Sequence, residues 1–224
     1  MKAGYAQQAT GETTILQQAY LWMFGGLLVT AFTSVGAAMS LDFQQALHSN
    51  PILFFGLIIA EFGLVIGISR TVMTLAPAVA MVLFLVYAFL NGLTLSSIFY
   101  VYQLGSVSAA FFSSAAVFGV MGVVGYTTKK DLSSIGMIAF MALIGIIIAA
   151  VVNFFLHSTM MGMLISFAAV LIFTALTAYD TQQLKRMSMS MPNNGSLGIY
   201  GALRLYLDFI NIFLSILRLM GNRR

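Results

Sequence analysis

The stretch LRLYLDFINIFLSILRLMG (residues 203–221) is long and apolar enough to cross a membrane as a helix, yet it carries an acid near its centre. Asp208 lies one turn after Arg204, among leucine, isoleucine and phenylalanine. A charged side chain within a bilayer is costly, and such residues face the bundle interior or a wet cavity and mark functional sites. We therefore expect Asp208 to be a functional residue of a membrane protein.

The composition supports an integral membrane protein. The 224 residues are 60% hydrophobic and only 7% charged, whereas soluble domains have about 25% charged residues. A net charge of +4 from so few charged residues indicates the lipid bilayer as the partner and no nucleic acid. The chain has no cysteine, and its two histidines, His48 and His157, are far apart. This pattern indicates no disulfide and no zinc cluster, and we expect no tightly bound cofactor.

Seven apolar segments are long enough to span a bilayer, for which about 20 residues suffice as a helix. They do not show the alternation of a membrane β-strand, so they predict an all-α protein. The predicted spans are residues 20–40, 52–70, 75–99, 106–127, 133–156, 160–186 and 198–220. We expect one transmembrane domain over residues 1–224, with a polar N-terminus at 1–19 and a loop at 187–197. The first segment is interpreted as a retained span rather than a cleaved signal.

Lysine and arginine predict the orientation, because they concentrate in cytoplasmic loops. With seven spans, the side that holds the N-terminus carries Lys2, Arg70, Lys129, Lys130, Lys185 and Arg186. The other side carries only the C-terminal Arg218, Arg223 and Arg224. We therefore expect the N-terminus in the cytoplasm and the C-terminus outside.

The two aspartates of the last two spans lie at comparable depths. Asp180 is about six residues, or roughly 9 Å, from the cytoplasmic end of the sixth span. Asp208 is about ten residues, or roughly 15 Å, into the seventh. Consecutive helices are usually neighbours, so we expect the two carboxyl groups to meet. Two close carboxylates in a low-dielectric site cannot both ionise cheaply and can share a proton.

This pairing predicts a pH-sensing contact between the sixth and seventh helices. With one shared proton, Asp180 and Asp208 bridge the two helices; when both are charged, they repel each other and offer oxygen ligands to a cation. The seventh helix adds polar residues at spacings of four and three, which place them on one helix face. That face carries Arg204, Asp208, Asn211, Ser215 and Arg218. The stripe predicts a lined pathway, and ordinary interhelical hydrogen bonds are the alternative.

Glu61, near the middle of the second span, has no cation close in sequence. It either lines the same cavity or is protonated and hydrogen-bonded, and the sequence leaves both interpretations open. Arg70 ends the same span nine residues later, on roughly the opposite face. Arg70 is best explained as an interfacial anchor that can still reach the acids of another helix.

Three segments resemble the Bax inhibitor-1 family, also called the transmembrane Bax-inhibitor-motif family, and its bacterial branch above all. They are LRLYLDFINIFLSILRLMG, AYDTQQLK (178–185) and KKDLS (129–133). The resemblance implies six helices that surround a central hydrophobic seventh helix in a bacterial inner membrane. It also implies a pH-sensitive calcium leak.

The resemblance further implies roles for individual residues. Asp180 and Asp208 match a dyad that closes the pore from the cytoplasmic side, and Arg70 matches an arginine associated with it. Glu61 is the candidate for an acid in the same span as Arg70. Calcium takes six to eight oxygen ligands, so we expect only weak, transient Ca²⁺ binding at Asp180 and Asp208 during permeation.

Other functions compete with this one. Tyr179–Asp180 fits the first motif of intramembrane aspartyl proteases, but Leu205 and Leu207 replace the glycines of their GxGD motif. A retinal protein would need a lysine within the seventh span, which this sequence lacks. We therefore expect no enzyme. The remaining alternative is a membrane interaction protein that regulates a membrane protease or a stress or cell-death response, in which the dyad is structural.

Overall fold

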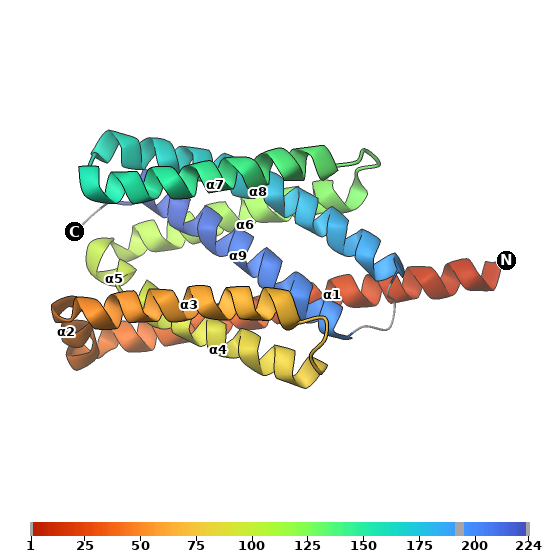
Figure 1. Cartoon of the computed structure of the whole chain (residues 1–224), viewed down its shortest axis with the longest axis horizontal. Coiled ribbons are helices and arrows are strands. Elements are labelled where there is room, and N and C mark those ends of the chain that lie inside the picture. The colour runs from red at the N-terminus through yellow and green to blue at the C-terminus, as the bar shows by residue number, and fades with distance from the viewer. Residues whose placement is uncertain (1, 191–194, 223–224) are drawn as a thin grey trace. The chain divides into compact units, whose positions relative to one another are not determined.

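The structure, a computed structural model, describes residues 2–190 and 195–222, and over these residues the chain consists of α-helices joined by short connections. Side chains are described from residue 15 onward within these ranges. The elements are α1 (Lys2–Met39), α2 (Leu41–Ser49), α3 (Pro51–Thr71), α4 (Pro77–Leu95), α5 (Ile98–Val101), α6 (Leu104–Thr127), α7 (Ser133–Leu156), α8 (Thr159–Ser190) and α9 (Gly195–Met220) (Figure 1). The prediction of an all-α protein is confirmed for this part of the chain.

Among the described residues, six helical segments are long and apolar enough to cross a membrane: 15–39, 51–71, 77–101, 104–127, 133–156 and 159–190. These agree with the first six predicted spans to within a few residues at most ends. The seventh predicted span is a helix, α9, but it is not among the six. It carries three charged residues, Arg204, Asp208 and Arg218. The seven-span count therefore stays a prediction.

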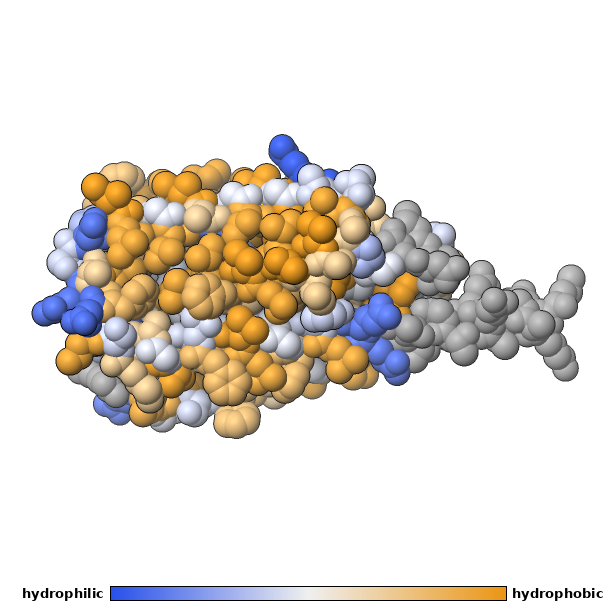
Figure 2. All heavy atoms as spheres, turned by 90° about the horizontal axis from the view of Figure 1, so that it is seen from below, coloured by the Kyte–Doolittle hydropathy of each residue, from blue (hydrophilic) through white to orange (hydrophobic). Residues whose placement is uncertain are grey.

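The six candidate spans expose large apolar side chains, as lipid contact requires. On α3, Ile52 is 84% exposed and Phe62 65%, and on α7, Met137 is 66% exposed and Ile138 63%. Figure 2 shows one such surface, on which hydrophobic residues predominate and strongly hydrophilic residues gather at the ends. Water-soluble proteins rarely expose large contiguous apolar surface, so the exposed faces support the membrane interpretation of the composition.

Local signals explain where several helices begin and end. The side chain of Asn50 accepts hydrogen bonds from the backbone N–H groups of Ile52 (3.1 Å) and Leu53 (3.3 Å), and Pro51 occupies the first helical position of α3. Asparagine caps and first-turn prolines satisfy or remove the unpaired donors of a helix N-terminus. α7 ends at Leu156, and its C-cap residue His157 adopts a left-handed conformation with φ 50°. These residues make the connections α2–α3 and α7–α8 very short.

The connections differ from the predicted ones at two places. Residues 41–49, expected as part of a loop, form the short helix α2, whose N-cap Ser40 accepts a hydrogen bond from the N–H of Phe43. The loop predicted at 187–197 is narrower, because α8 continues to Ser190 and α9 begins at Gly195. Residues 191–194 of this loop lie outside the described residues. The polar N-terminus predicted at 1–19 is part of α1 from Lys2 onward.

The described residues form two compact units. The first holds residues 2–102, 187–190 and 195–206, and the second holds residues 103–186 and 207–222. Helix α9 contributes its first half to one unit and its second half to the other. The expectation of a single domain over 1–224 stays a prediction.

Aromatic side chains of α9 lie in the core of each unit. In the first unit, the ring of Tyr206 packs edge-on against Phe84 and Tyr87, with centroids 5.7 Å apart in both pairs. In the second unit, Phe209 packs against Phe111 at 5.4 Å and Phe118 at 5.7 Å. Edge-to-face pairs at such distances are favourable, and they fix how α9 packs in each unit.

Candidate functional site

Asp180 lies in α8 within a buried polar segment of the second unit. Its side chain is 6% exposed, and its neighbours Thr181 and Gln182 are 1% and 5% exposed. The hydroxyl of Thr181 donates to the carbonyl of Thr177, and that of Thr177 donates to the carbonyl of Phe173, both at 2.8 Å. Because these hydroxyls bond within their own helix, the polarity of the segment resides mainly in Asp180 and Gln182.

Gln182 joins this segment to the α6–α7 connection. Its side-chain oxygen accepts from the N–H of Leu132 at 2.9 Å, and its side-chain nitrogen donates to the carbonyl of Lys130 at 2.8 Å. A buried glutamine that satisfies both a donor and an acceptor of a loop fixes that loop in one register. The sequence reasoning assigned Gln182 no role of its own within AYDTQQLK. Its amide, two residues after a buried acid, was the signal for a positioning role.

Two cations farther along α8 bind the end of α6 and the α6–α7 connection. The ammonium of Lys185 donates to the carbonyl of Tyr126 at 3.1 Å and lies 4.4 Å from the centre of its ring. Arg186 forms an ion pair of 2.9 Å with Asp131, and the two side chains are 42% and 64% exposed. Exposed ion pairs contribute little stability, so Gln182 rather than Arg186 is the principal tether.

The side chain of Asp131 is negatively charged even at pH values well below neutral. The hydroxyl and backbone N–H of Ser133, followed by Arg186, lower the pKa of Asp131 from 3.8 to about 2. Ser133 donates to the same carboxylate oxygen through its hydroxyl at 2.7 Å and its N–H at 2.9 Å. Asp131 therefore stays charged throughout the physiological range and cannot be the source of a response between pH 6 and 8.

Glycines bring the neighbouring helices very close to α8 next to Asp180. A Cβ atom at Gly125 of α6 would overlap the carbonyl oxygen of Ala178 and lie 2.9 Å from its Cα. A Cβ atom at Gly136 of α7 would lie 2.5 Å from the ring of Tyr179. Small residues of this kind permit close helix packing in membranes. The two residues before Asp180 are thus held by backbone-to-backbone and ring-to-backbone contact.

Asp208 is also buried in the second unit, at 4% exposure. The polar face predicted on α9 is uneven in exposure: Ser215 is buried with Asp208, Arg204 and Asn211 are half-buried, and Arg218 is exposed. Asp180 and Asp208 are therefore both buried, and both belong to the second compact unit. Their direct contact, and their role as a pH-sensing dyad, stay predictions.

The other polar residues of this face have local partners. Arg204 donates to the hydroxyl of Tyr200 at 3.3 Å and lies 5.7 Å from the centre of its ring. The amide nitrogen of Asn211 donates to the carbonyl of Leu207 at 2.7 Å, one turn earlier in its own helix. For Asn211, this bond supports the structural alternative, because its N–H is used within α9. Its amide oxygen can still face a pathway.

Glu61 lies in a separate hydrogen-bond network inside the first unit. Asn91 of α4 donates to one carboxylate oxygen at 3.1 Å, and Thr94 of the same helix donates to the other. Both carboxylate oxygens of Glu61 thus accept hydrogen bonds from α4. Its protonation and its place beside a pathway stay predictions.

The network continues from Asn91 to α9 and α1. The hydroxyl of Tyr206 donates to the amide oxygen of Asn91 at 3.0 Å and lies 2.6 Å from the hydroxyl of Thr30. A chain of side-chain hydrogen bonds therefore links α1, α9, α4 and α3 and ends on Glu61. Thr30, Asn91 and Tyr206 are at most 7% exposed. The sequence analysis missed all three, although a polar Asn91 inside an apolar span was a usable signal.

Arg70 is exposed in the last turn of α3. A cation there complements the partial negative charge of the helix C-terminus, as expected for an interfacial anchor. Its association with the two aspartates stays a prediction. Among the described residues, no three His, Asp or Glu side chains group together as metal ligands would, and any cation site would have to draw on fewer carboxylates.

Comparison with known proteins places this architecture in a family. A family model described as inhibitor of apoptosis-promoting Bax1 matches residues 12–224. The chain belongs to the Bax inhibitor-1 family. This confirms the resemblance of the α8 and α9 segments and, with the six apolar helices, makes the protein an integral membrane protein.

Bacterial relatives within this family match almost the whole chain. The inner membrane protein YbhL of Escherichia coli K12 is 46% identical over 223 residues, which cover 97% of this chain and 95% of the relative. An uncharacterized membrane protein of Streptococcus pyogenes serotype M3 is 40% identical over 225 residues, covering 97% and 96%. An uncharacterized protein of Borreliella burgdorferi is 38% identical over 222 residues, covering 97% and 96%.

Proposed function

We propose that the protein is a pH-sensitive calcium leak channel or transporter of a bacterial inner membrane, gated by Asp180 and Asp208. The observation that carries this proposal is the burial of both aspartates, at 6% and 4% exposure, in one compact unit of a Bax inhibitor-1 family member. Buried carboxylates are expensive in a membrane protein and are typically retained for function.

In the proposed mechanism, the state of one proton decides whether the gate is closed. With one shared proton, a carboxyl–carboxylate hydrogen bond joins α8 to α9 and closes the pathway at its cytoplasmic end. When the proton leaves, the two charges repel each other and the contact opens. The freed oxygens then bind Ca²⁺ weakly and transiently, because permeation requires a site that the ion can leave.

The proposal assigns the surrounding residues to the same pathway. α9 serves as a central seventh span, with the N-terminus in the cytoplasm and the C-terminus outside. Glu61, Arg204, Asn211 and Ser215 line or support the pathway, and Arg70 acts with the dyad from the cytoplasmic end. The attachment of α8 to the α6–α7 connection through Gln182 supports this proposal, because it gives Asp180 a fixed position.

The test is calcium influx into liposomes that contain the pure protein and a calcium dye, followed between pH 6 and pH 8. The parent is compared with Asp180→Asn and Asp208→Asn, and Asp131→Asn serves as a matched control because its carboxylate is exposed and lies outside the dyad. We expect flux that rises with pH in the parent and control and that loses its pH dependence in both dyad variants. The absence of flux above empty liposomes at every pH would contradict the proposal.

A second candidate is a membrane interaction protein that regulates a membrane protease or a stress or cell-death response. The family's description as an inhibitor of apoptosis-promoting Bax1 favours it, and we propose no enzymatic activity in either case. The discriminating experiment is a pull-down from membranes with the parent and the Asp180→Asn/Asp208→Asn double variant. Partners that persist in the double variant, together with a parent that shows no ion flux, would favour interaction over transport.

A further inference from the structure

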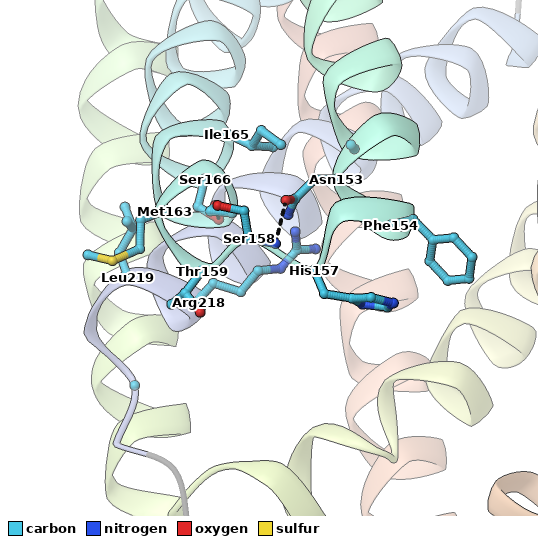
Figure 3. A pocket seen from close by; sticks show the side chains of 13 residues that line it. Asn153, Phe154, His157, Ser158, Thr159, Met163, Ile165, Ser166, Arg218 and Leu219 are labelled. Atoms are coloured by element: carbon cyan, nitrogen blue, oxygen red, sulfur yellow. Dashed lines mark hydrogen bonds between the residues drawn. The ribbon is translucent and has the colours of Figure 1, made fainter.

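A pocket with a cavity volume of about 630 Å³ lies in the second unit, where α7 ends, α8 begins and α9 ends (Figure 3). It includes the α7–α8 turn at His157 and Ser158 and the side chain of Arg218, which reaches from α9 toward that turn. The candidate dyad is elsewhere, since Asp208 lies ten residues before Arg218, or roughly 15 Å along the helix. The proposed calcium function uses none of the pocket's polar residues.

The polar lining of this pocket is rich in hydrogen-bond donors and lacks acids. Arg218 and His157 line it together with Asn153, Ser158, Thr159 and Ser166, and none of the lining residues is Asp or Glu. Arg218 forms no hydrogen bond or ion pair with any residue that the structure describes, so its five N–H donors are available to a ligand. The net character of the pocket is therefore cationic.

At the α7–α8 turn, side-chain oxygens accept hydrogen bonds from nearby backbone N–H groups, whereas side-chain donors stay available to a ligand. The amide oxygen of Asn153 accepts from the N–H of Ser158 at 3.1 Å, and the hydroxyl oxygen of Ser158 accepts from the N–H of Met161 at 3.3 Å. Within the described part of the chain, neither the amide nitrogen of Asn153 nor the hydroxyl proton of Thr159 is donated to another group. The unused hydrogen-bonding groups of this pocket are donors that lie beside an arginine. Such a pocket is suited to an anion with several oxygens.

The position of the pocket at the ends of two candidate membrane spans indicates which class of anion it binds. α7 ends at Leu156 and α8 begins at Thr159, and both helices are candidate membrane spans, so the pocket lies where a span meets the headgroup layer. Its lining also includes Phe154 and Met163, which are 58% and 53% exposed and are suited to acyl chains. Arginine binds phosphate through two parallel N–H donors, which an ammonium cannot reproduce.

We propose that this pocket binds the phosphate of an anionic phospholipid headgroup, with the Arg218 guanidinium as its principal donor. The Asn153 amide and the Thr159 hydroxyl supply further donors, and Phe154 and Met163 contact the first part of an acyl chain. The site would hold one lipid against the ends of three helices.

The experiment is native mass spectrometry of the full chain in detergent, titrated with dioleoylphosphatidylglycerol. We expect Arg218→Gln to weaken binding of this lipid about tenfold, the loss of a charge-assisted hydrogen bond. Lys129→Gln is the matched control: it removes one exposed cation from the same unit at the α6–α7 connection, outside the pocket, and should bind as the parent does. Dioleoylglycerol, which lacks the phosphate, should show no dependence on Arg218.

A second variant keeps the proposal testable if Arg218→Gln does not fold. Thr159→Glu places a carboxylate beside Arg218 in the first turn of α8, where an acid stabilises the helix, and it should weaken lipid binding as strongly. Equal affinity of the parent and Thr159→Glu for phosphatidylglycerol would overturn the proposal. Displacement of the lipid by millimolar inorganic phosphate would assign the site to a free anion and overturn the lipid assignment. Neither readout involves calcium, so both are independent of the proposed transport.

Discussion

The two units hold their intramembrane acids in different ways: Glu61 is half-buried, whereas Asp180 and Asp208 are buried. In the first unit, Glu61 is held by side chains, because Asn91 and Thr94 donate to its two oxygens and Tyr206 extends the network. In the second unit, the surroundings of Asp180 are held by close backbone packing at Gly125 and by Gln182, which bonds to loop backbone atoms. A single acid surrounded by neutral donors is suited to a supporting role, whereas two acids in one compact unit are suited to a change of charge.

The largest expected effect comes from filling the close contact beside Asp180. Gly125→Ala would place a methyl group against the Ala178 backbone, so α6 and α8 must move apart, at a cost of about 1–3 kcal/mol. Gly119→Ala is the control in the same helix, because a Cβ there meets nothing within 4 Å, and it should gain about 0.5–1 kcal/mol. Unfolding in mixed micelles measures both, and equal stability of the two variants would refute the proposed packing.

A smaller effect is expected from breaking the Glu61 network. Asn91→Ala removes a partner from both Glu61 and Tyr206, and side-chain hydrogen bonds in membrane proteins contribute about 0.6 kcal/mol each, and at most about 1.7. We expect a loss of about 1–2 kcal/mol in the same unfolding assay. If Glu61 has only a structural role, Asn91→Ala keeps the pH profile of calcium flux. A profile shifted as far as that of Asp180→Asn would make the network part of the gate.

The smallest effect is expected at the exposed ion pair. The lowered pKa of Asp131 means that its stabilising contribution is complete above pH 3.8 and is lost as the pH falls through about 2. Asp131→Asn should therefore lower stability only slightly, because the Arg186–Asp131 pair is exposed, and by the same amount at every pH from 6 to 8, and it should leave the pH profile of flux unchanged. A variant whose pH profile moves in that range would show that the α6–α7 connection, and not the aspartate pair alone, senses protons.

Prediction from the sequence succeeded where the type of residue alone determines its environment, as for a long apolar run or an acid within one. Long apolar runs predicted the first six candidate spans, and Asp180 and Asp208 were singled out because buried acids are rare in such runs. It failed where the consequence depends on a distant partner. Gln182 bonds to Leu132 and Lys130, which are 50 and 52 residues away in the sequence. Tyr206 bonds to Asn91, which is 115 residues away. These bonds depend on how distant segments pack together. A helix at 41–49 was missed because it is too short and polar to resemble a span.

The central claim is that Asp180 and Asp208 share a proton that leaves within the physiological range. Infrared difference spectroscopy of the protein in lipid, between pH 5 and pH 9, tests it through the C=O stretch of a protonated carboxyl group. The account predicts a band at low pH that disappears between pH 6 and pH 8 in the parent and in Asp131→Asn, and that is altered or absent in both Asp180→Asn and Asp208→Asn. A parent with no such band, or a band that persists unchanged in either dyad variant, would contradict it.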